Sequence, residues 1–370
     1  MTTIEEFRSG FGEEPGYLDF ARLGPLGAAV IAEEQAQLEL LRRVRFGSLA
    51  GLASQDERLR DAVAGLTGFR ADQVVFQPDT STGLMHAMFG LTGGVLLSPA
   101  EFPAVTFAVA RAAEALGVLV PSWLEPGPVT PAGVKEHLSA KTVAVAVSLV
   151  DYRTGYLADI DGIRQVIGDR LLIVDAVQGI GVVEAPYAVA DVVVAGGQKW
   201  LRAGRGTGLM VMSDRALERL TPVFSGFAAD AVELPSEVGH PGAGAAAYSM
   251  SPPSPVAQAR LATAIEEISA VGVPAINRAV AERVGRIIEL ADEFAIPVSS
   301  SRAEHERAGI VVLEPASDQF TVLVASLFNH GVSVTARQGT VRVSAHVSTT
   351  DETLQMLRSA FSGFAGAVTV

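Results

Sequence analysis

The sequence predicts an α/β fold, with a large domain built on a mostly parallel sheet and a small C-terminal α+β domain. Between about residue 60 and residue 215, short β-branched apolar runs alternate with longer helix-like stretches. These runs are apolar at consecutive positions, as strands buried on both faces require. A loop rich in Gly, Pro, Ala and Ser over 224–256 then divides the chain, so we expect one unit at 1–255 and a linking helix with the small domain at 256–370.

The elements can be assigned in chain order from the same patterns. The strand candidates of the large domain are residues 74–76, 94–98, 142–149, 171–175, 191–194 and 207–212. A helical stretch from Thr80 to Phe89 follows the first of them. Beyond the loop, two helices and a small α+β unit are expected at 257–270, 276–294, 309–313 (strand), 318–329 (helix), 332–335 (strand) and 341–345 (strand).

Composition excludes several classes of protein. The 370 residues carry a net charge of −13 and no cysteine, which rules out disulfides, thiolate nucleophiles and Cys-ligated metal sites. A hydrophobic fraction of 49% predicts sizeable buried cores, whereas a pI near 5.0 argues against a nucleic-acid or anionic-membrane partner. The N-terminus lacks the features of a signal peptide, no apolar run suits a membrane span, and the six histidines show no metal-binding spacing, so we expect a cytoplasmic protein.

Four predicted strands end next to side chains that carry chemistry. Phe102 follows the second strand, Tyr152 the third, Asp175 ends the fourth and Lys199 follows the fifth. Ligands of open parallel sheets bind beyond the carboxyl ends of the strands, so these groups should converge there. Taken singly, Asp175 could be a turn former, Lys199 a surface lysine and Phe102 a core residue. Together they favour a functional site.

This set matches the requirements of pyridoxal phosphate chemistry. In that chemistry a lysine holds the cofactor as a Schiff base and a carboxylate keeps the pyridine nitrogen protonated. Lys199 would hold the cofactor and shuttle the α-proton, Asp175 would pair with the pyridinium, and Phe102 would stack on the ring. Gln178 would hydrogen-bond the ring hydroxyl.

The phosphate of such a cofactor needs an anion site. Thr80, Ser81 and Thr82 open the helical stretch after the first strand, where free backbone N–H groups and hydroxyls could bind it. Simple helix capping is an equally good explanation for these three residues.

Several motifs resemble the class V aminotransferases, a fold-type I pyridoxal-phosphate group that includes cysteine desulfurases, kynureninases and isopenicillin N epimerase-like proteins. The resemblance covers nearly the whole chain, and it is carried by Tyr17-Leu18-Asp19-Phe20, Asp175-Ala176-Val177-Gln178-Gly179, Gly197-Gln198-Lys199-Trp200-Leu201, Gly206-Thr207-Gly208 and Arg342-Val343-Ser344-Ala345-His346. The run Glu101-Phe102-Pro103 looks closer to the kynureninase and epimerase-like branches than to the desulfurases.

The resemblance implies a homodimer with active sites at the subunit interface and an amino-acid-like substrate. Arg342 would bind the substrate carboxylate, with Arg337 and Arg22 as rival candidates. Gln198 and Tyr152 join the expected cofactor contacts.

Two departures from the family pattern bear on activity. Desulfurases need a cysteine, and its absence excludes that reaction. Relatives commonly carry Ser at position 196 and His at position 198, where this chain has Gly196 and Gln198, so the phosphate contacts should differ.

The sequence therefore predicts a pyridoxal-phosphate enzyme, with aminotransfer as the first expectation. β-Elimination or C–S cleavage and epimerisation are alternatives, because all begin with α-proton abstraction. A non-catalytic pseudoenzyme is the alternative of another class, suggested by Gly196 and Gln198. A nicotinamide oxidoreductase is disfavoured because the Gly-rich run 242–247 does not follow a buried strand.

Overall fold

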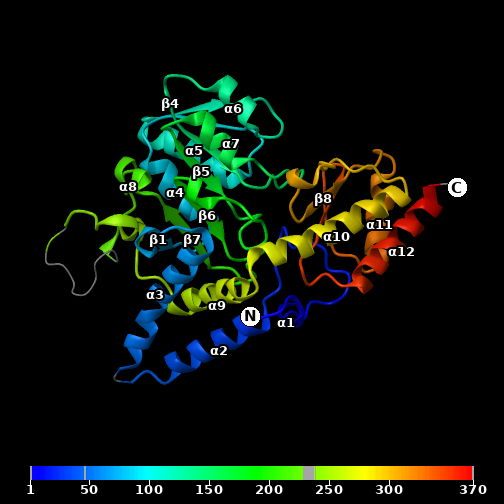
Figure 1. Ribbon diagram of the computed structural model, residues 1–370, viewed down its shortest axis with the longest axis horizontal. Coiled ribbons are helices and arrows are strands. Elements are labelled where there is room, and N and C mark those ends of the chain that lie inside the picture. Colours follow the sequence, from blue (N-terminus) through cyan, green and yellow to red (C-terminus); the bar gives the residue numbers. More distant parts are fainter. Residues whose placement is uncertain (1, 46, 228–236, 238, 369–370) are drawn as a thin grey trace.

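The computed structural model describes residues 2–45, 47–227, 237 and 239–368, and its core is a seven-stranded sheet (Figure 1). The strands are β1 (Val74–Phe76), β2 (Gly93–Leu97), β3 (Leu119–Trp123), β4 (Thr142–Ser148), β5 (Leu171–Asp175), β6 (Val192–Gly196) and β7 (Gly208–Met212). Their order is β1-β7-β6-β5-β4-β2-β3. The five strands from β6 to β3 are parallel, while β7 runs antiparallel to both β6 and β1. The predicted mostly parallel sheet is confirmed.

Successive residues of the central strands enter two different hydrophobic cores, which is why the runs are apolar at every position. One core includes side chains of α4 (Thr80–Gly90), α5 (Pro103–Leu116) and α8 (Asp214–Arg219). The opposite core includes side chains of α6 (Pro131–His137), α7 (Ile160–Ile167), α3 (Ser48–Thr67) and α9 (Pro255–Val271). Helices therefore cover both faces of the sheet.

The long helices connect this sheet to the small domain. α2 (Ala28–Arg42) and α3 form a helical hairpin that extends at the lower left of Figure 1, and both contact α9. α10 (Val273–Glu293) continues from α9 toward the small domain, after Gly272 at a φ of 91°.

The small domain has an antiparallel sheet in the order β8-β10-β9, formed by β8 (Ile310–Leu313), β9 (Thr335–Arg337) and β10 (Thr340–Ser344). The helices α11 (Phe320–Asn329) and α12 (Asp351–Val368) lie at this end of the molecule, whereas α1 (Ile4–Ser9) lies below the junction of α9 and α10 and contacts α9. Between α1 and α2, the N-terminal segment pairs with the small domain through bridges from Tyr17 to Ser333 and from Asp19 to Ser344. The division at residue 255 stays a prediction.

The strand expected at 332–335 is wrong in position. β9 begins only at Thr335, because Ser333 instead exchanges backbone hydrogen bonds with Gly16 and Leu18 of the N-terminal segment. Helices α1, α2, α3 and α12 and strand β3 have no counterpart among the expected elements, and α5, α6, α7 and α8 correspond at most to the helix-like stretches expected without bounds. Part of the loop expected at 224–256, namely 228–236 and 238, lies outside the described residues.

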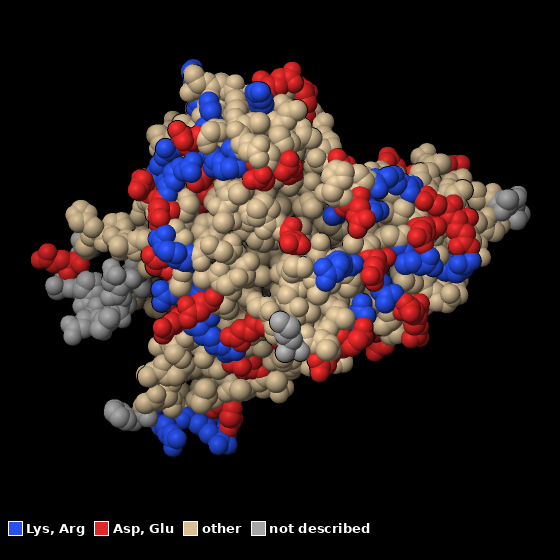
Figure 2. All heavy atoms as spheres, in the orientation of Figure 1, with Lys and Arg blue, Asp and Glu red and all other residues tan. Residues whose placement is uncertain are grey.

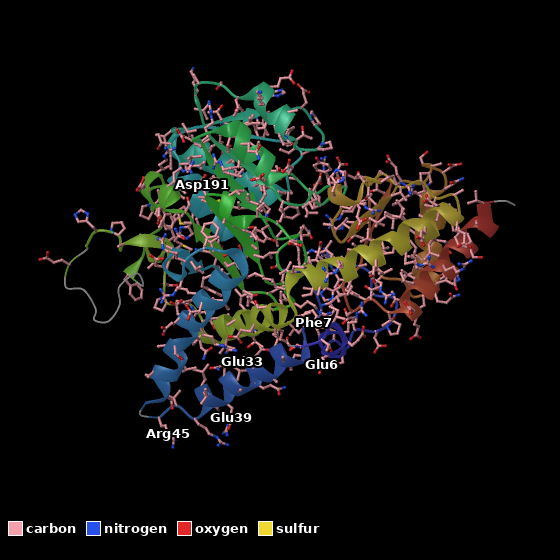
Figure 3. The ribbon with its side chains drawn as sticks, in the orientation of Figure 1. Glu6, Phe7, Glu33, Glu39, Arg45 and Asp191 are labelled. Carbon is pink, nitrogen blue, oxygen red and sulfur yellow. The ribbon has the colours of Figure 1, made fainter. Side chains whose placement is uncertain are left out.

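One buried carboxylate lies at the amino ends of the parallel strands, opposite to the carboxyl ends where the site residues are expected. Asp191, labelled in Figure 3, lies just before β6 and is 2% exposed. It binds Arg164 at 2.7 Å and Arg215 at 3.3 Å, and it accepts a hydrogen bond from Ser213 at 2.8 Å. This buried charge is therefore paired.

The surface shown in Figure 2 carries acidic and basic side chains interspersed with each other. Among the described residues, no helix is both long and apolar enough to cross a lipid bilayer.

Candidate active site

The predicted strand ends meet at one edge of the sheet, because β2, β4, β5 and β6 are consecutive neighbours in it. Phe102 is the residue that precedes α5. The Nζ atom of Lys199 lies 5.3 Å from the centre of the Phe102 ring. Tyr152 packs edge-on against that ring, with 5.1 Å between the ring centres. Lysine and aromatic groups thus face each other as the sequence predicts.

Lys199 is buried, with 8% of its surface exposed. Burial lowers its pKa to about 8, while the charge of Asp175 opposes this effect and that of Arg342 adds to it. The chain has three lysines, and the other two, Lys135 and Lys141, are exposed. An amine with a depressed pKa is a suitable nucleophile toward a carbonyl group.

Asp175 is also buried, with 3% exposed. Burial raises its pKa to about 6, although a hydrogen bond from the Val177 N–H at 3.0 Å and the charge of Lys199 favour the carboxylate. A cation placed next to it would restore its ordinary ionisation. This carboxylate therefore suits a protonated ring nitrogen.

The loop that carries Lys199 has a constrained backbone. Gly197 accepts a hydrogen bond from the Ala203 N–H at 2.8 Å, and Arg202 has a φ of 56°, in the left-handed region. Gly24 of the N-terminal segment touches the Lys199 carbonyl so closely that a Cβ there would overlap it. The position of the lysine thus depends on the N-terminal segment as well as on the sheet.

The start of α4 presents polar groups toward Gly196. Thr80 Oγ1 is buried and has no hydrogen-bond partner. A Cβ built on Gly196 would lie 3.1 Å from this atom and would overlap the carboxamide oxygen of Gln198. A buried hydroxyl without a partner is uncommon and fits a site for an anion such as a phosphate.

The other two residues of the predicted phosphate site differ from Thr80. Ser81 is exposed, whereas Thr82 donates its backbone N–H, at 2.8 Å, and its hydroxyl, at 3.1 Å, to Asp79. Thr82 therefore participates in helix capping, the alternative that the sequence left open.

Gln178 connects three segments through its carboxamide. Its Nε2 donates to the Ala21 carbonyl at 3.0 Å, and its Oε1 accepts from the Trp200 indole at 2.9 Å. One N–H of the amide is left for a further acceptor. The residue therefore orients the loop after Lys199 in addition to any contact with a cofactor.

Arg342 lies on β10 and points to the same site. Its Nη1 donates to the Tyr152 carbonyl at 3.2 Å and its Nη2 to Thr335 Oγ1 at 3.3 Å. Its Nε is buried without a partner. With 13% of its side chain exposed, Arg342 keeps donors free for a carboxylate.

Asp19 is a site residue that sequence reasoning missed. Its side chain, 7% exposed, lies 3.7 Å from Arg342 and 3.9 Å from Arg22, and it accepts a hydrogen bond from Thr335 at 2.7 Å. Burial raises its pKa, against the effects of Thr335 and the two arginines. Its place in the Tyr17–Phe20 motif was the available signal. Arg22 is 71% exposed and therefore lies at the rim.

Glu101 is a second missed residue, although it precedes Phe102 in a motif that the sequence singled out. It is 9% exposed and binds the end of β4, where both its oxygens accept from the Ser148 N–H at 3.1 Å and the Ser148 hydroxyl also donates. Burial raises its pKa to about 7, and repulsion from Asp175 adds to the shift. Glu101 thus fixes the turn that carries Phe102.

The histidines set aside as ordinary residues include two buried ones. His346 stacks on Phe20, with 5.1 Å between ring centres, while both ring nitrogens of His86 lack partners. Among the described residues, no three His, Cys, Asp or Glu side chains gather so that they could hold a metal ion.

Comparison with known proteins agrees with this geometry. The family described as Aminotransferase class-V matches residues 29–362. A protein of Bacillus subtilis (strain 168), named as an uncharacterized aminotransferase, YcbU, is 23% identical over 312 residues, which cover 81% of each chain.

Several solved structures share the fold. The cysteine desulfurase of Thermococcus onnurineus NA1 has a TM-score of 0.84 at 21% identity and covers 97% of both chains. The cystine C–S lyase C-DES, solved with its product cysteine persulfide, has a TM-score of 0.84 at 18% identity and covers 94% of this chain and 97% of its own.

The fold-type I expectation is thereby confirmed, while the branch within the family stays a prediction. The buried lysine, the buried carboxylate and the unpartnered hydroxyl at the start of α4 fit pyridoxal 5'-phosphate. Because the family match spans most of its length, the chain belongs to the class V aminotransferase family of pyridoxal-phosphate-dependent enzymes.

Proposed function

We propose that this enzyme acts on an amino acid, most simply as an aminotransferase, with Lys199 as the cofactor-holding residue. The observation that carries the proposal is the position of Lys199, the one buried lysine of the three, which faces the Phe102 ring and is near enough to Asp175 for that charge to affect its pKa. Arg342 lies close enough to affect the pKa of this lysine. A substrate carboxylate on Arg342 would therefore bring its α-amino group near Lys199.

Each residue has a separate task. Pyridoxal 5'-phosphate, when bound, withdraws electrons from the substrate Cα and so acidifies its proton. Lys199 would take that proton at Nζ and return it, and Asp175 would keep the ring nitrogen protonated. Phe102 would stack on the ring, with Tyr152 supporting it from the side. The free amide N–H of Gln178 would bind the ring hydroxyl.

The phosphate would be held at the start of α4. Thr80, Ser81 and the carboxamide of Gln198 are its proposed ligands, together with backbone N–H groups of the first turn. Thr82 would contribute through the conformation of that turn, because Asp79 occupies its donors.

A C–S lyase is the second candidate. The fold matches that of the cystine C–S lyase C-DES, and this chain has no cysteine with which to accept sulfur as a desulfurase must. A lyase that releases sulfur to solution needs no such residue. Epimerisation remains a third outcome of the same proton abstraction.

We also propose that the enzyme is a cytoplasmic homodimer. Apolar side chains are exposed on the α2–α3 hairpin, among them Leu38 at 52%, Val44 at 50% and Leu49 at 64%. Exposed apolar clusters of this kind are typical of interaction surfaces. Light scattering coupled to size-exclusion chromatography tests the dimer, since a monomer mass would refute it.

The reaction is tested by a screen of L-amino acids with and without keto acids. New keto acid that requires an added keto acid identifies aminotransfer, whereas ammonia or sulfide identifies elimination, and inverted substrate identifies epimerisation. Lys199→Ala serves as the blank. Product formed by the Lys199→Ala variant would contradict the assignment of Lys199.

A further inference from the structure

The β9–β10 hairpin presents a face made only of cationic and hydroxyl side chains. Thr335 pairs directly with Arg342, and Arg337 pairs with Thr340. Directly paired residues and residues two apart point to the same face of a sheet, so Arg337, Arg342 and the two threonines share one face. Ala336 and Val341 form the pair between these two pairs. Their side chains occupy the other face and contribute to the hydrophobic core.

This face is turned toward the active site. Arg342 contacts the Tyr152 carbonyl at 3.2 Å, and Tyr152 packs on Phe102, which faces Lys199. Arg337 is held at a defined place by the turn, because Gln338 and Gly339 both have positive φ, 50° and 85°, as a tight two-residue hairpin requires. The hairpin thus sets the backbone position of Arg337, whose side chain is exposed.

In the part of the chain that the structure describes, the two arginines of this face have one carboxylate, that of Asp19, within ion-pair distance. Asp19 is the carboxylate within ion-pair distance of Arg342, and it also lies 3.9 Å from Arg22. Among the described residues, the guanidinium of Arg337 has no ion pair or hydrogen bond, and its charge lowers the pKa of Arg342 after the larger effect of burial. An anion next to Arg337 would relieve this repulsion.

We infer that the substrate is an amino acid with a second anionic group in its side chain, and that Arg337 binds this distal group while Arg342 binds the α-carboxylate. The two arginines are diagonal neighbours on the hairpin face, so one small molecule can reach both. The inference rests on the proposed function and adds the substrate class to it. Carboxylate, sulfonate and phosphate share the required chemistry.

The test uses the cofactor-loaded full chain and pairs of amino acids that differ in one charge. The pairs are L-aspartate with L-asparagine, L-glutamate with L-glutamine, and L-cysteate or O-phospho-L-serine with L-serine. Calorimetric titration at low salt gives the dissociation constants, and NMR in D2O gives the rate of α-proton exchange at saturation. Wild-type protein is expected to bind the anionic member about tenfold or more tightly.

Arg337→Gln should remove this preference, because the charge that binds the distal group is lost. Arg337→Lys should keep part of the preference for the anionic amino acid, since the positive charge remains but the planar guanidinium is lost. Arg278→Gln is the matched control: Arg278 is an exposed arginine on α10 and should keep the full preference.

The outcomes separate the two proposals. Equal affinity for both members of every pair, or a preference that survives in Arg337→Gln, overturns the inference and leaves the proposed function standing. Absence of binding and of exchange with every amino acid overturns the proposed function, and the inference with it. A preference for one anionic type alone identifies which of the three groups the natural substrate carries.

Discussion

The carboxamide oxygen of Gln198 occupies the space beside Gly196 that any side chain at position 196 would need. The residues that differ from the expected pattern at positions 196 and 198 are therefore coupled to each other. The glycine makes room for the longer polar side chain, which reaches toward Thr80 and the start of α4. We propose that the Gln198 amide replaces the hydroxyl missing at position 196.

This coupling is tested by a double-mutant cycle on cofactor affinity. Gly196→Ala displaces the Gln198 carboxamide and Gln198→Ala removes it, so each should weaken cofactor binding by roughly 1.5 kcal/mol, about tenfold. The double variant should be no worse than either single variant, because both delete the same contact. Equilibrium dialysis of cofactor-free protein measures the constants. Additive losses would show that the residues act independently.

Lys199→Ala should abolish the borohydride-reducible attachment of the cofactor and all turnover while the far-ultraviolet circular dichroism stays native. The reason is that a neighbouring amine is required for covalent attachment, and the other lysines are exposed. Lys135→Ala and Lys141→Ala are the controls and should retain the full amount of borohydride-reduced, covalently attached cofactor. A reducible adduct in Lys199→Ala, located by peptide mass mapping, would move the anchor to another residue.

The pKa of Lys199, lowered to about 8, predicts how the attachment rate depends on pH. Neutral amine is the reactive form, so the rate should rise with pH up to about 8 and then level off. Asp175→Asn removes a charge that stabilises the ammonium form, and the midpoint should shift to lower pH. Stopped-flow absorbance follows the reaction. An unchanged midpoint would mean that the two groups do not interact.

The same variant tests the role of Asp175 in the reaction. Asp175→Asn should still attach the cofactor but lose orders of magnitude in α-proton exchange, because a protonated ring matters in the transition state of proton removal. Deuterium exchange followed by NMR provides the measurement. Equal rates in wild type and variant would reduce Asp175 to a residue that shapes the turn before Val177.

Arg342→Ala should cost roughly 1.5–3 kcal/mol of substrate binding, mainly in KM, with little effect on cofactor affinity. The loss arises because the buried guanidinium provides charge-assisted hydrogen bonds to the α-carboxylate. Steady-state kinetics gives kcat/KM, with Arg278→Ala as the control on an exposed arginine. If kcat/KM were unchanged, the α-carboxylate would belong to Arg337 or Arg22.

Glu101 predicts a pH dependence of stability. Its pKa is raised by burial from 4.5 to about 7, so the folded state holds the proton more firmly than the unfolded state. This contribution to the free energy of unfolding is complete below about pH 4.5 and is lost as the pH rises to about 7. Glu101→Gln lacks it, so its stability relative to wild type should increase between pH 5 and pH 8.

Urea unfolding of the cofactor-free protein at the two pH values gives this comparison. Asp175 titrates in both proteins, and its contribution largely cancels in the difference. Glu136→Gln, at an exposed glutamate on α6, should show no such change. A constant difference between wild type and Glu101→Gln would mean that Glu101 is ionised throughout.

The parts of the site that the sequence predicts are those that depend on local order. Asp175 ends an apolar run, and Phe102 and Lys199 follow such runs within five residues. Neighbouring parallel strands bring such positions together. The phosphate site expected at the start of α4 likewise follows from its place directly after the strand at 74–76. These inferences need only the strands and their direction.

The parts that were missed depend on contacts between distant segments. Asp19 meets Thr335 across 316 positions of sequence, and nothing near Asp19 indicates that β9 lies beside it. α2 buries only Val30 and Gln37, so it lacks the periodic apolar stripe by which a helix is usually detected. The misplaced strand at 332–335 has the same origin, since Ser333 pairs with the N-terminal segment.

The pairing of the N-terminal segment with β10 also sets the order in which the enzyme can be completed during synthesis. Ala21, whose carbonyl binds Gln178, donates its own N–H to Ser344 Oγ at 2.9 Å. The segment around Ala21 therefore cannot complete these contacts until Ser344 has been synthesised, and closing a loop of this length is intrinsically slow. A chain that stopped before residue 340 would contain Lys199 and the whole large sheet, yet Asp19 and Ala21 would lack their partner Ser344 on β10.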